Sequence, residues 1–181
     1  MMKAAGFAML LALTAPAGAA GITYDCDTAA EHWSELNLPA DRRGFSVTGN
    51  VQLSMLAASK TFVPTVRIQV AESSPPGKPS AHYAGFSLGA LPVGERKTPA
   101  GQTATQMLSY NVSGKDDEVL PMSMLVNPGA VQPFSMVYDG SSLAVTIVES
   151  KSFPLKLTDP VVRIVCSTGE FLITDLTITP R

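Results

Sequence analysis

Most of the chain alternates apolar and polar residues with a period of two, and this pattern limits the fold more than any other feature. In the segment 45–55, apolar residues at alternate positions are separated by serine, threonine, asparagine and glutamine. Such alternation is typical of a half-buried β-strand. A hairpin turning at Gly49-Asn50 is the alternative, but it would place Val47 opposite Gln52 on one face. We therefore expect one long strand with a bulge at Gly49.

The same pattern recurs along the rest of the chain. Further short alternating stretches lie at 66–70, 82–91, 108–112, 122–126, 134–138, 143–148, 161–166 and 171–178. Asp139-Gly140-Ser141 and Ser167-Thr168-Gly169 are turn signals between the late strands. The 14 glycines and 14 prolines suit many short strands and turns. The prediction is an all-β fold, an antiparallel two-sheet sandwich of the jelly-roll type, with residues 21–181 as one domain.

One segment near the start has helical features instead. Thr28 and Glu31 match a capping box, and Trp33 and Leu36 are three positions apart, so they would share a helix face. Pro39 would end the helix. We therefore expect one short N-terminal helix before the strands begin.

The first twenty residues read as a secretory signal peptide. Lys3 precedes an apolar run at 4–13, and small residues at 17–20 allow cleavage after Ala19 or Ala20. A transmembrane anchor is the alternative, but it needs about 20 apolar residues and this run is much shorter. No later segment reaches that length. We expect residues 1–20 to be removed, no membrane span afterwards, and a periplasmic or secreted protein.

Export favours a disulfide between the two cysteines. Cys26 and Cys166 are the only cysteines of the chain, and exported proteins form disulfides readily. We predict a Cys26–Cys166 disulfide, and two buried free thiols are the alternative. Two cysteines and two histidines lack the paired spacing of a zinc site, so the sequence predicts no metal and no cofactor.

Charge narrows the range of partners. The chain has 13 basic and 15 acidic residues, for a net charge of −2. Without a basic excess to neutralise phosphates, a nucleic-acid partner is not expected. A charged fraction of 15% and 45% hydrophobic residues also exclude a disordered, highly charged chain.

Two groups of residues resemble catalytic or metal sites. Residues 85–89 match the G-x-S-x-G nucleophile elbow, but both histidines precede Ser87, and residues 90–94 are unsuited to the helix that the motif requires. Near the start, an acidic group surrounds His32 and consists of Asp25, Asp27, Glu31 and Glu35. A capped helix start accounts for Glu31, and acidic residues in a first turn suit the helix dipole. We assign no catalytic residue to either group.

The last third of the chain carries a family resemblance. Residues 133–148 form a strand, a turn containing Asp139-Gly140 and a second strand, and residues 161–178 contain two more strands. This run resembles the closing strands of concanavalin A-like lectin/glucanase sandwiches, which implies a jelly-roll fold. The chain lacks the E-x-D-x-E cluster of laminarinases and the Q-x-H motif of alginate lyases. The resemblance therefore implies no catalytic residue.

These observations favour an exported, non-catalytic binding module for carbohydrate or another cell-envelope ligand. Strand alternation turns four polar side chains outward, and they are the candidate ligand-binding residues: Asn50, Gln52, Arg67 and Gln69. Two alternatives remain open. One is a structural or accessory envelope protein that binds a protein partner through a sheet edge or face, and the other is a hydrolase with an unrecognised site.

Overall fold

Two antiparallel sheets form the structure, which is a computed structural model that describes residues 21–56, 59, 61–90, 104–113, 117–125 and 129–181. Sheet A has the strand order β1-β12-β3-β8-β9-β10. Its strands are β1 (Ile22–Asp27), β12 (Gly169–Pro180), β3 (Phe45–Leu56), β8 (Val131–Tyr138), β9 (Ser142–Thr146) and β10 (Ser150–Pro154). Sheet B has the order β2-β11-β4-β5-β6-β7. Its strands are β2 (Trp33–Pro39), β11 (Pro160–Ser167), β4 (Thr65–Glu72), β5 (His82–Ala90), β6 (Ala104–Ser113) and β7 (Asp117–Leu125).

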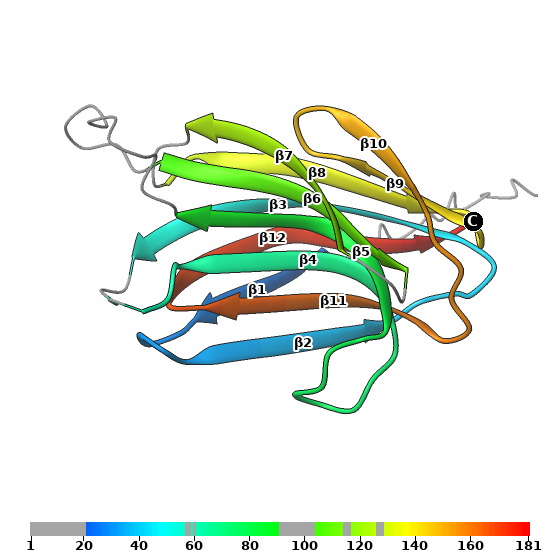
Figure 1. Ribbon diagram of the computed structural model, residues 1–181, viewed down its shortest axis with the longest axis horizontal. Coiled ribbons are helices and arrows are strands. Elements are labelled where there is room, and N and C mark those ends of the chain that lie inside the picture. Colours follow the sequence, from blue (N-terminus) through cyan, green and yellow to red (C-terminus); the bar gives the residue numbers. More distant parts are fainter. Residues whose placement is uncertain (1–20, 57–58, 60, 91–103, 114–116, 126–128) are drawn as a thin grey trace, which may run out of the picture.

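The sheets stack face to face (Figure 1). Their inward side chains form a hydrophobic core between them. Phe86 of β5 packs on Phe134 of β8 with ring centroids 5.1 Å apart, so this aromatic pair joins sheet B to sheet A. Sequential strands often lie in different sheets, and the first and last strands, β1 and β12, are hydrogen-bonded neighbours. The predicted antiparallel two-sheet sandwich is confirmed.

The long strand predicted over 45–55 is confirmed as β3, but the bulge expected at Gly49 lies in the partner strand, and β3 itself has one extra residue, Ser54, between its pairs with Phe171 and Glu170. Asn50 pairs with Thr174 and Thr48 with Thr177, so two residues of β12 bulge opposite Gly49. One of them, Asp175, has a positive φ of 54°. A Cβ atom at Gly49 would lie 3.3 Å from the Cα of Leu176. The lack of a side chain at Gly49 therefore leaves room for the bulge, which belongs to β12.

The predicted N-terminal helix is wrong, because the segment 33–39 forms strand β2. Thr28 does not cap a helix: its hydroxyl donates to the carbonyl oxygen of Gly169 at 2.8 Å, 141 residues away. Glu31 has a positive φ of 65°, which a right-handed helix does not allow. In the described part of the chain, no helix is long and apolar enough to cross a membrane.

The predicted disulfide joins the two sheets. Cys26 lies in β1 of sheet A and Cys166 in β11 of sheet B, with Cα atoms 6.3 Å apart and a bond between their sulfur atoms. Both cysteines are buried in the core. The disulfide prediction is confirmed, and the alternative of two free thiols is excluded.

Candidate functional site

The four sequence-predicted ligand residues lie on opposite faces of the sandwich. Asn50 and Gln52 belong to β3 and turn outward from sheet A, whereas Arg67 and Gln69 belong to β4 and turn outward from sheet B. On sheet A, the Asn50 amide donates to the Asp175 carboxylate at 3.1 Å. The structure thus separates the four residues into two pairs that cannot contact one small ligand together.

A hollow of about 350 Å³ opens on the outer face of sheet B beside Arg67. Its lining comes from β4, from β11 and from the segment that precedes β4: Thr61, Phe62, Val63, Thr65, Arg67, Val165 and Ser167. The neighbours Val66 and Ile68 are fully buried in the core, so alternation turns Thr65 and Arg67 outward. The hollow combines hydroxyl groups, apolar side chains and one guanidinium group.

Two exposed aromatic rings lie at this end of sheet B. Phe62 lines the hollow and is 53% exposed. Trp33 begins β2, pairs with Ser167 of the hollow and is 55% exposed. The helix expected for this segment does not predict that Trp33 lies exposed at the start of β2. Period-two alternation in the segment 33–39 would have turned Trp33 to the same face as Glu35.

Two arginines lie on this face with opposite electrostatic environments. Arg163 donates to Glu35 at 3.0 Å, and both side chains are almost fully buried. The other oxygen of that carboxylate accepts from the Asn37 amide at 2.6 Å. Arg67, by contrast, is exposed and makes no hydrogen bond or ion pair with any residue in the described part of the chain. Of these two arginines, Arg163 is therefore neutralised, whereas the charge of Arg67 has no partner among the described residues.

Residues 73–81 connect β4 to β5 and form a strap over part of this face. The Arg163 guanidinium donates to the hydroxyl of Ser80 at 3.1 Å. Gly77 lies against the ring of Trp33, since an added Cβ would be 3.6 Å from that ring. Figure 1 shows this connection extending past β11 and β2. The strap covers Arg163 and reaches Trp33, so it bounds the open part of the face.

Gln69 lies beside Arg163 in the register of β4 and β11 and is only 5% exposed. The Arg163 Nε atom next to it is buried and has no hydrogen-bond partner among the described residues. The two predicted residues of β4 therefore differ. Arg67 is exposed and lines the hollow, whereas Gln69 is buried beside Arg163.

The G-x-S-x-G segment lies inside a regular strand. Ser87 is in the middle of β5, pairs with Arg67 of β4 and is buried. A nucleophile elbow needs its serine at a sharp turn between a strand and a helix. Gly85 has a packing reason, because a Cβ there would collide with the carbonyl oxygen of Ile68. The motif is thus part of the sheet and not a strand–helix turn.

The acidic residues near the start do not assemble into a cluster. Asp25 and Asp27 turn outward from sheet A, whereas Glu35 lies on sheet B with Arg163. Among the residues that the structure describes, no three His, Cys, Asp or Glu side chains come together as a metal site. Asp27 instead lines a small hollow of about 50 Å³ with Glu170 and Met55.

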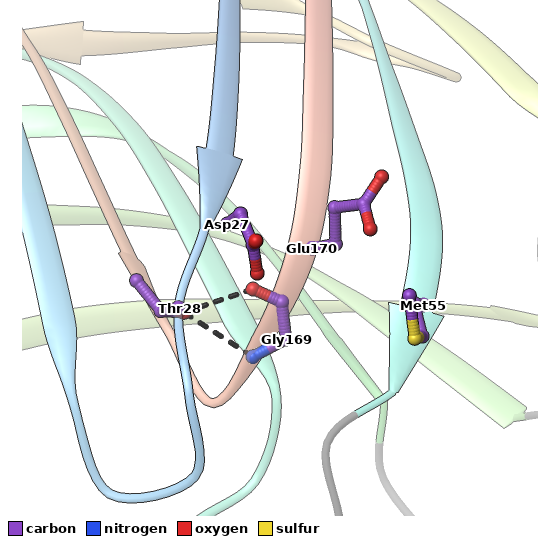
Figure 2. A pocket seen from close by; sticks show the side chains of 5 residues that line it. All are labelled: Asp27, Thr28, Met55, Gly169 and Glu170. Atoms are coloured by element: carbon purple, nitrogen blue, oxygen red, sulfur yellow. Dashed lines mark hydrogen bonds between the residues drawn. The ribbon is translucent and has the colours of Figure 1, made fainter.

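Figure 2 shows the residues that line this small hollow. The Thr28 hydroxyl donates to the Gly169 carbonyl at 2.8 Å and accepts from the Gly169 amide at 3.2 Å. This double contact fastens the chain after β1 to the start of β12. The hollow beside it is much smaller than that on sheet B, so we place the candidate ligand site on sheet B.

Comparisons with known proteins support the fold. No protein-family model matches the sequence, and no curated protein sequence matches it. Among solved structures, a polysaccharide lyase family 18 enzyme is 11% identical and has a TM-score of 0.55, with 92% of this chain and 90% of that chain covered. An alginate lyase from Alteromonas sp. 272 is 12% identical with a TM-score of 0.51, covering 81% of this chain and 78% of that one. The carbohydrate-binding module CBM66 from Bacillus subtilis is 4% identical with a TM-score of 0.50, covering 86% and 85%. The chain shares with these proteins the antiparallel two-sheet sandwich fold that the resemblance implied.

Proposed function

We propose that this protein is an exported, non-catalytic carbohydrate-binding module whose site is the hollow on the outer face of sheet B. In this proposal residues 1–20 are a cleaved signal peptide and residues 21–181 form the single binding domain. The observation that carries the proposal is a hollow lined with hydroxyl groups, Arg67 and the exposed ring of Phe62, with the exposed Trp33 paired to Ser167 of the lining.

The chemistry of this hollow suits a saccharide. A sugar ring has an apolar face of C–H groups and a rim of hydroxyl groups. Flat aromatic side chains offer large apolar area to the former, and fixed polar groups orient the latter. Thr65 and Ser167 are paired across β4 and β11, which fixes their backbone. The Thr65 hydroxyl donates to the Val63 carbonyl at 2.9 Å, so it is oriented and offers its oxygen as an acceptor.

Two further observations support the proposal. The Cys26–Cys166 disulfide is typical of proteins in oxidising compartments outside the cytoplasm. The solved structures of similar fold include proteins described as polysaccharide lyases and as a carbohydrate-binding module. Their low identity carries no residue assignment to this chain.

Intrinsic fluorescence tests the proposal directly, because Trp33 is the only tryptophan of the chain. The mature protein is screened on a glycan array, and each bound glycan is then titrated while Trp33 emission is followed. We expect a blue shift on binding, because a stacked sugar removes water from the indole. Binding without any change at Trp33 would place the site elsewhere, and absence of binding to every glycan would overturn the proposed function.

Matched variants locate the site. Phe62→Ala is expected to weaken binding about tenfold or more, since burial of a phenylalanine side chain contributes about 1.5–3 kcal/mol. Val131→Ala is the control, because Val131 is equally exposed, at 54%, but lies in β8 of sheet A. Equal losses in the two variants would contradict a site on sheet B. Trp33→Ala has lost the tryptophan emission, so the binding of glycans to this variant is measured by calorimetric titration.

A further inference from the structure

We propose that the hollow on sheet B selects saccharides that carry an anionic group, a carboxylate or a sulfate, and that Arg67 is the residue that determines this specificity. The inference rests on the proposed function and names the ligand class of the same site.

The charge of Arg163 is already balanced inside the protein. Its guanidinium donates to Glu35 at 3.0 Å and to Ser80 at 3.1 Å. The strap also covers it, which leaves 8% of the residue exposed. Arg163 is therefore a structural cation that holds β2, β11 and the strap together, and it has no open side for a ligand.

Arg67 has no such balance. Its cross-strand neighbours are Val165 on β11 and Ser87 on β5, and both are uncharged. Glu35 is the acidic residue in the same row, beyond Val165, but both of its oxygens accept hydrogen bonds, from Arg163 and Asn37. The acidic side chain described in the row of Arg67 is thus occupied. The guanidinium of Arg67 remains available in a chain whose net charge is −2.

The surroundings of Arg67 strengthen its interaction with an anion. The hollow is walled by Val165, Val63 and Phe62, and a partly apolar wall lowers the local dielectric constant. A guanidinium group binds carboxylate and sulfate oxygens through two parallel hydrogen bonds, which adds direction to the attraction. Trp33 and Phe62 can stack a sugar ring while Arg67 holds its anionic substituent.

A matched pair of ligands tests the selectivity. The wild-type protein is titrated with oligogalacturonate and with its methyl ester, in which a methyl group replaces the charge of each carboxylate, and with a sulfated galactan oligosaccharide of the same length. We expect the methyl ester to bind roughly tenfold more weakly than the free acid, the size typical of a hydrogen bond to a charged group. The comparison of the carboxylated and sulfated ligands identifies which anion the site prefers.

Variants of Arg67 assign the effect to this residue. Arg67→Gln should remove the preference for the acid over the ester, and Arg67→Lys should retain part of it, because the charge remains but the planar fork is lost. Lys156→Gln is the control, as it removes an exposed positive charge from the segment between β10 and β11. A preference for the acid that survives Arg67→Gln would overturn the assignment. Equal affinity for acid and ester in the wild type would overturn the selectivity but leave the carbohydrate-binding function standing.

A second measurement needs no sugar and therefore separates this inference from the proposed function. Iodide and caesium both quench tryptophan, but an uncompensated cation near Trp33 attracts iodide and repels caesium. The effect extends over about 10 Å at 0.1 M ionic strength. We expect the ratio of the iodide to the caesium quenching constant to be higher for Trp33 than for free N-acetyltryptophanamide, and Arg67→Gln to lower it toward that reference. A wild-type ratio no higher than that of the free indole would show that the charge of Arg67 is balanced, and would overturn the inference.

Discussion

Glu35 and Arg163 form an ion pair between neighbouring strands on the outer face of sheet B, with the nitrogen and oxygen atoms 3.0 Å apart and 7% and 9% of the respective side chains exposed. The pair lies beneath the strap, whose Ser80 accepts a second bond from Arg163. Because the pair is so well covered, water cannot solvate the charge that remains when one partner is removed.

We therefore predict that Glu35→Gln lowers the free energy of unfolding by about 3–5 kcal/mol, because it leaves the charge of Arg163 buried and unbalanced. Urea denaturation followed by circular dichroism measures the change. The double variant Glu35→Leu, Arg163→Met should lose less than Glu35→Gln alone, since no charge then remains to be solvated. A double variant that is less stable than the single one would show that the hydrogen bonds to the strap contribute more than the charge balance.

A second prediction concerns the two glycines of the G-x-S-x-G segment. A Cβ at Gly85 would lie 2.7 Å from the Cα of Gln69 and would collide with the carbonyl oxygen of Ile68, whereas a Cβ at Gly89 would lie 3.5 Å from the Thr65 hydroxyl. Gly85→Ala should therefore cost about 1–3 kcal/mol, since backbone of the adjacent strand must move. Gly89→Ala is the matched control and should change stability by less than about 1 kcal/mol. Thermal melts of both variants measure this difference, and equal costs would contradict the close approach of β4 to Gly85.

The strand pattern of this protein could be predicted from its sequence because alternation reports directly on burial. The segment 45–53 shows this well, because its alternating apolar residues are all buried, whereas Met55, beyond the extra residue Ser54, is 60% exposed. The sheet to which each strand belongs could not be predicted, because alternation has the same form in both sheets. That is why Asn50 and Arg67 could be assigned to outward faces but not to opposite sides of the molecule.

The short helix was predicted wrongly for a related reason. Thr28 and Glu31 have the spacing of a capping box, but a local motif stabilises a helix only when no stronger tertiary contact competes. The Thr28 hydroxyl instead bonds to Gly169, and the residues that follow gain a full strand pairing with β11. The candidate site depended on this segment, because Trp33 reaches the outer face of sheet B only when β2 is a strand.

A third prediction concerns Asp139 in the turn between β8 and β9. Its carboxylate accepts hydrogen bonds from the amides of Ser141 and Ser142 at 2.9 and 2.7 Å and from both serine hydroxyls. The Ser141 amide and the Ser142 hydroxyl are the leading causes that hold the pKa of Asp139 well below its usual range. A carboxyl group whose pKa is lower in the folded than in the unfolded state stabilises the fold above its unfolded pKa, near 4, and loses this contribution as the pH falls through the folded value.

Asp139→Asn should therefore lower stability at neutral pH, and it should flatten the dependence of the unfolding midpoint on pH below about 4. Urea midpoints measured from pH 7 down to pH 2 give both quantities. Asp159→Asn is a suitable comparison, as Asp159 is an exposed loop aspartate for which the structure shows no side-chain hydrogen bond among the described residues. Parallel pH profiles for wild type and Asp139→Asn would contradict the role of the turn.

The last prediction concerns the disulfide between the sheets. Cys26 and Cys166 are separated by 140 residues, and closing so long a loop restricts the unfolded chain far more than the folded one. The chain-entropy account gives roughly 5 kcal/mol as an upper figure, and we expect Cys26→Ala, Cys166→Ala to lose about 2–5 kcal/mol while its far-ultraviolet circular dichroism stays that of a β-protein. Because both cysteines are at most 1% exposed, a thiol reductant should leave the native bond intact and cleave it only when urea opens the core. Mass spectrometry after alkylation, with and without urea, distinguishes the two states. Rapid alkylation of both thiols in the folded protein under reductant would show that the sheets separate at this point far more easily than the burial of the bond implies.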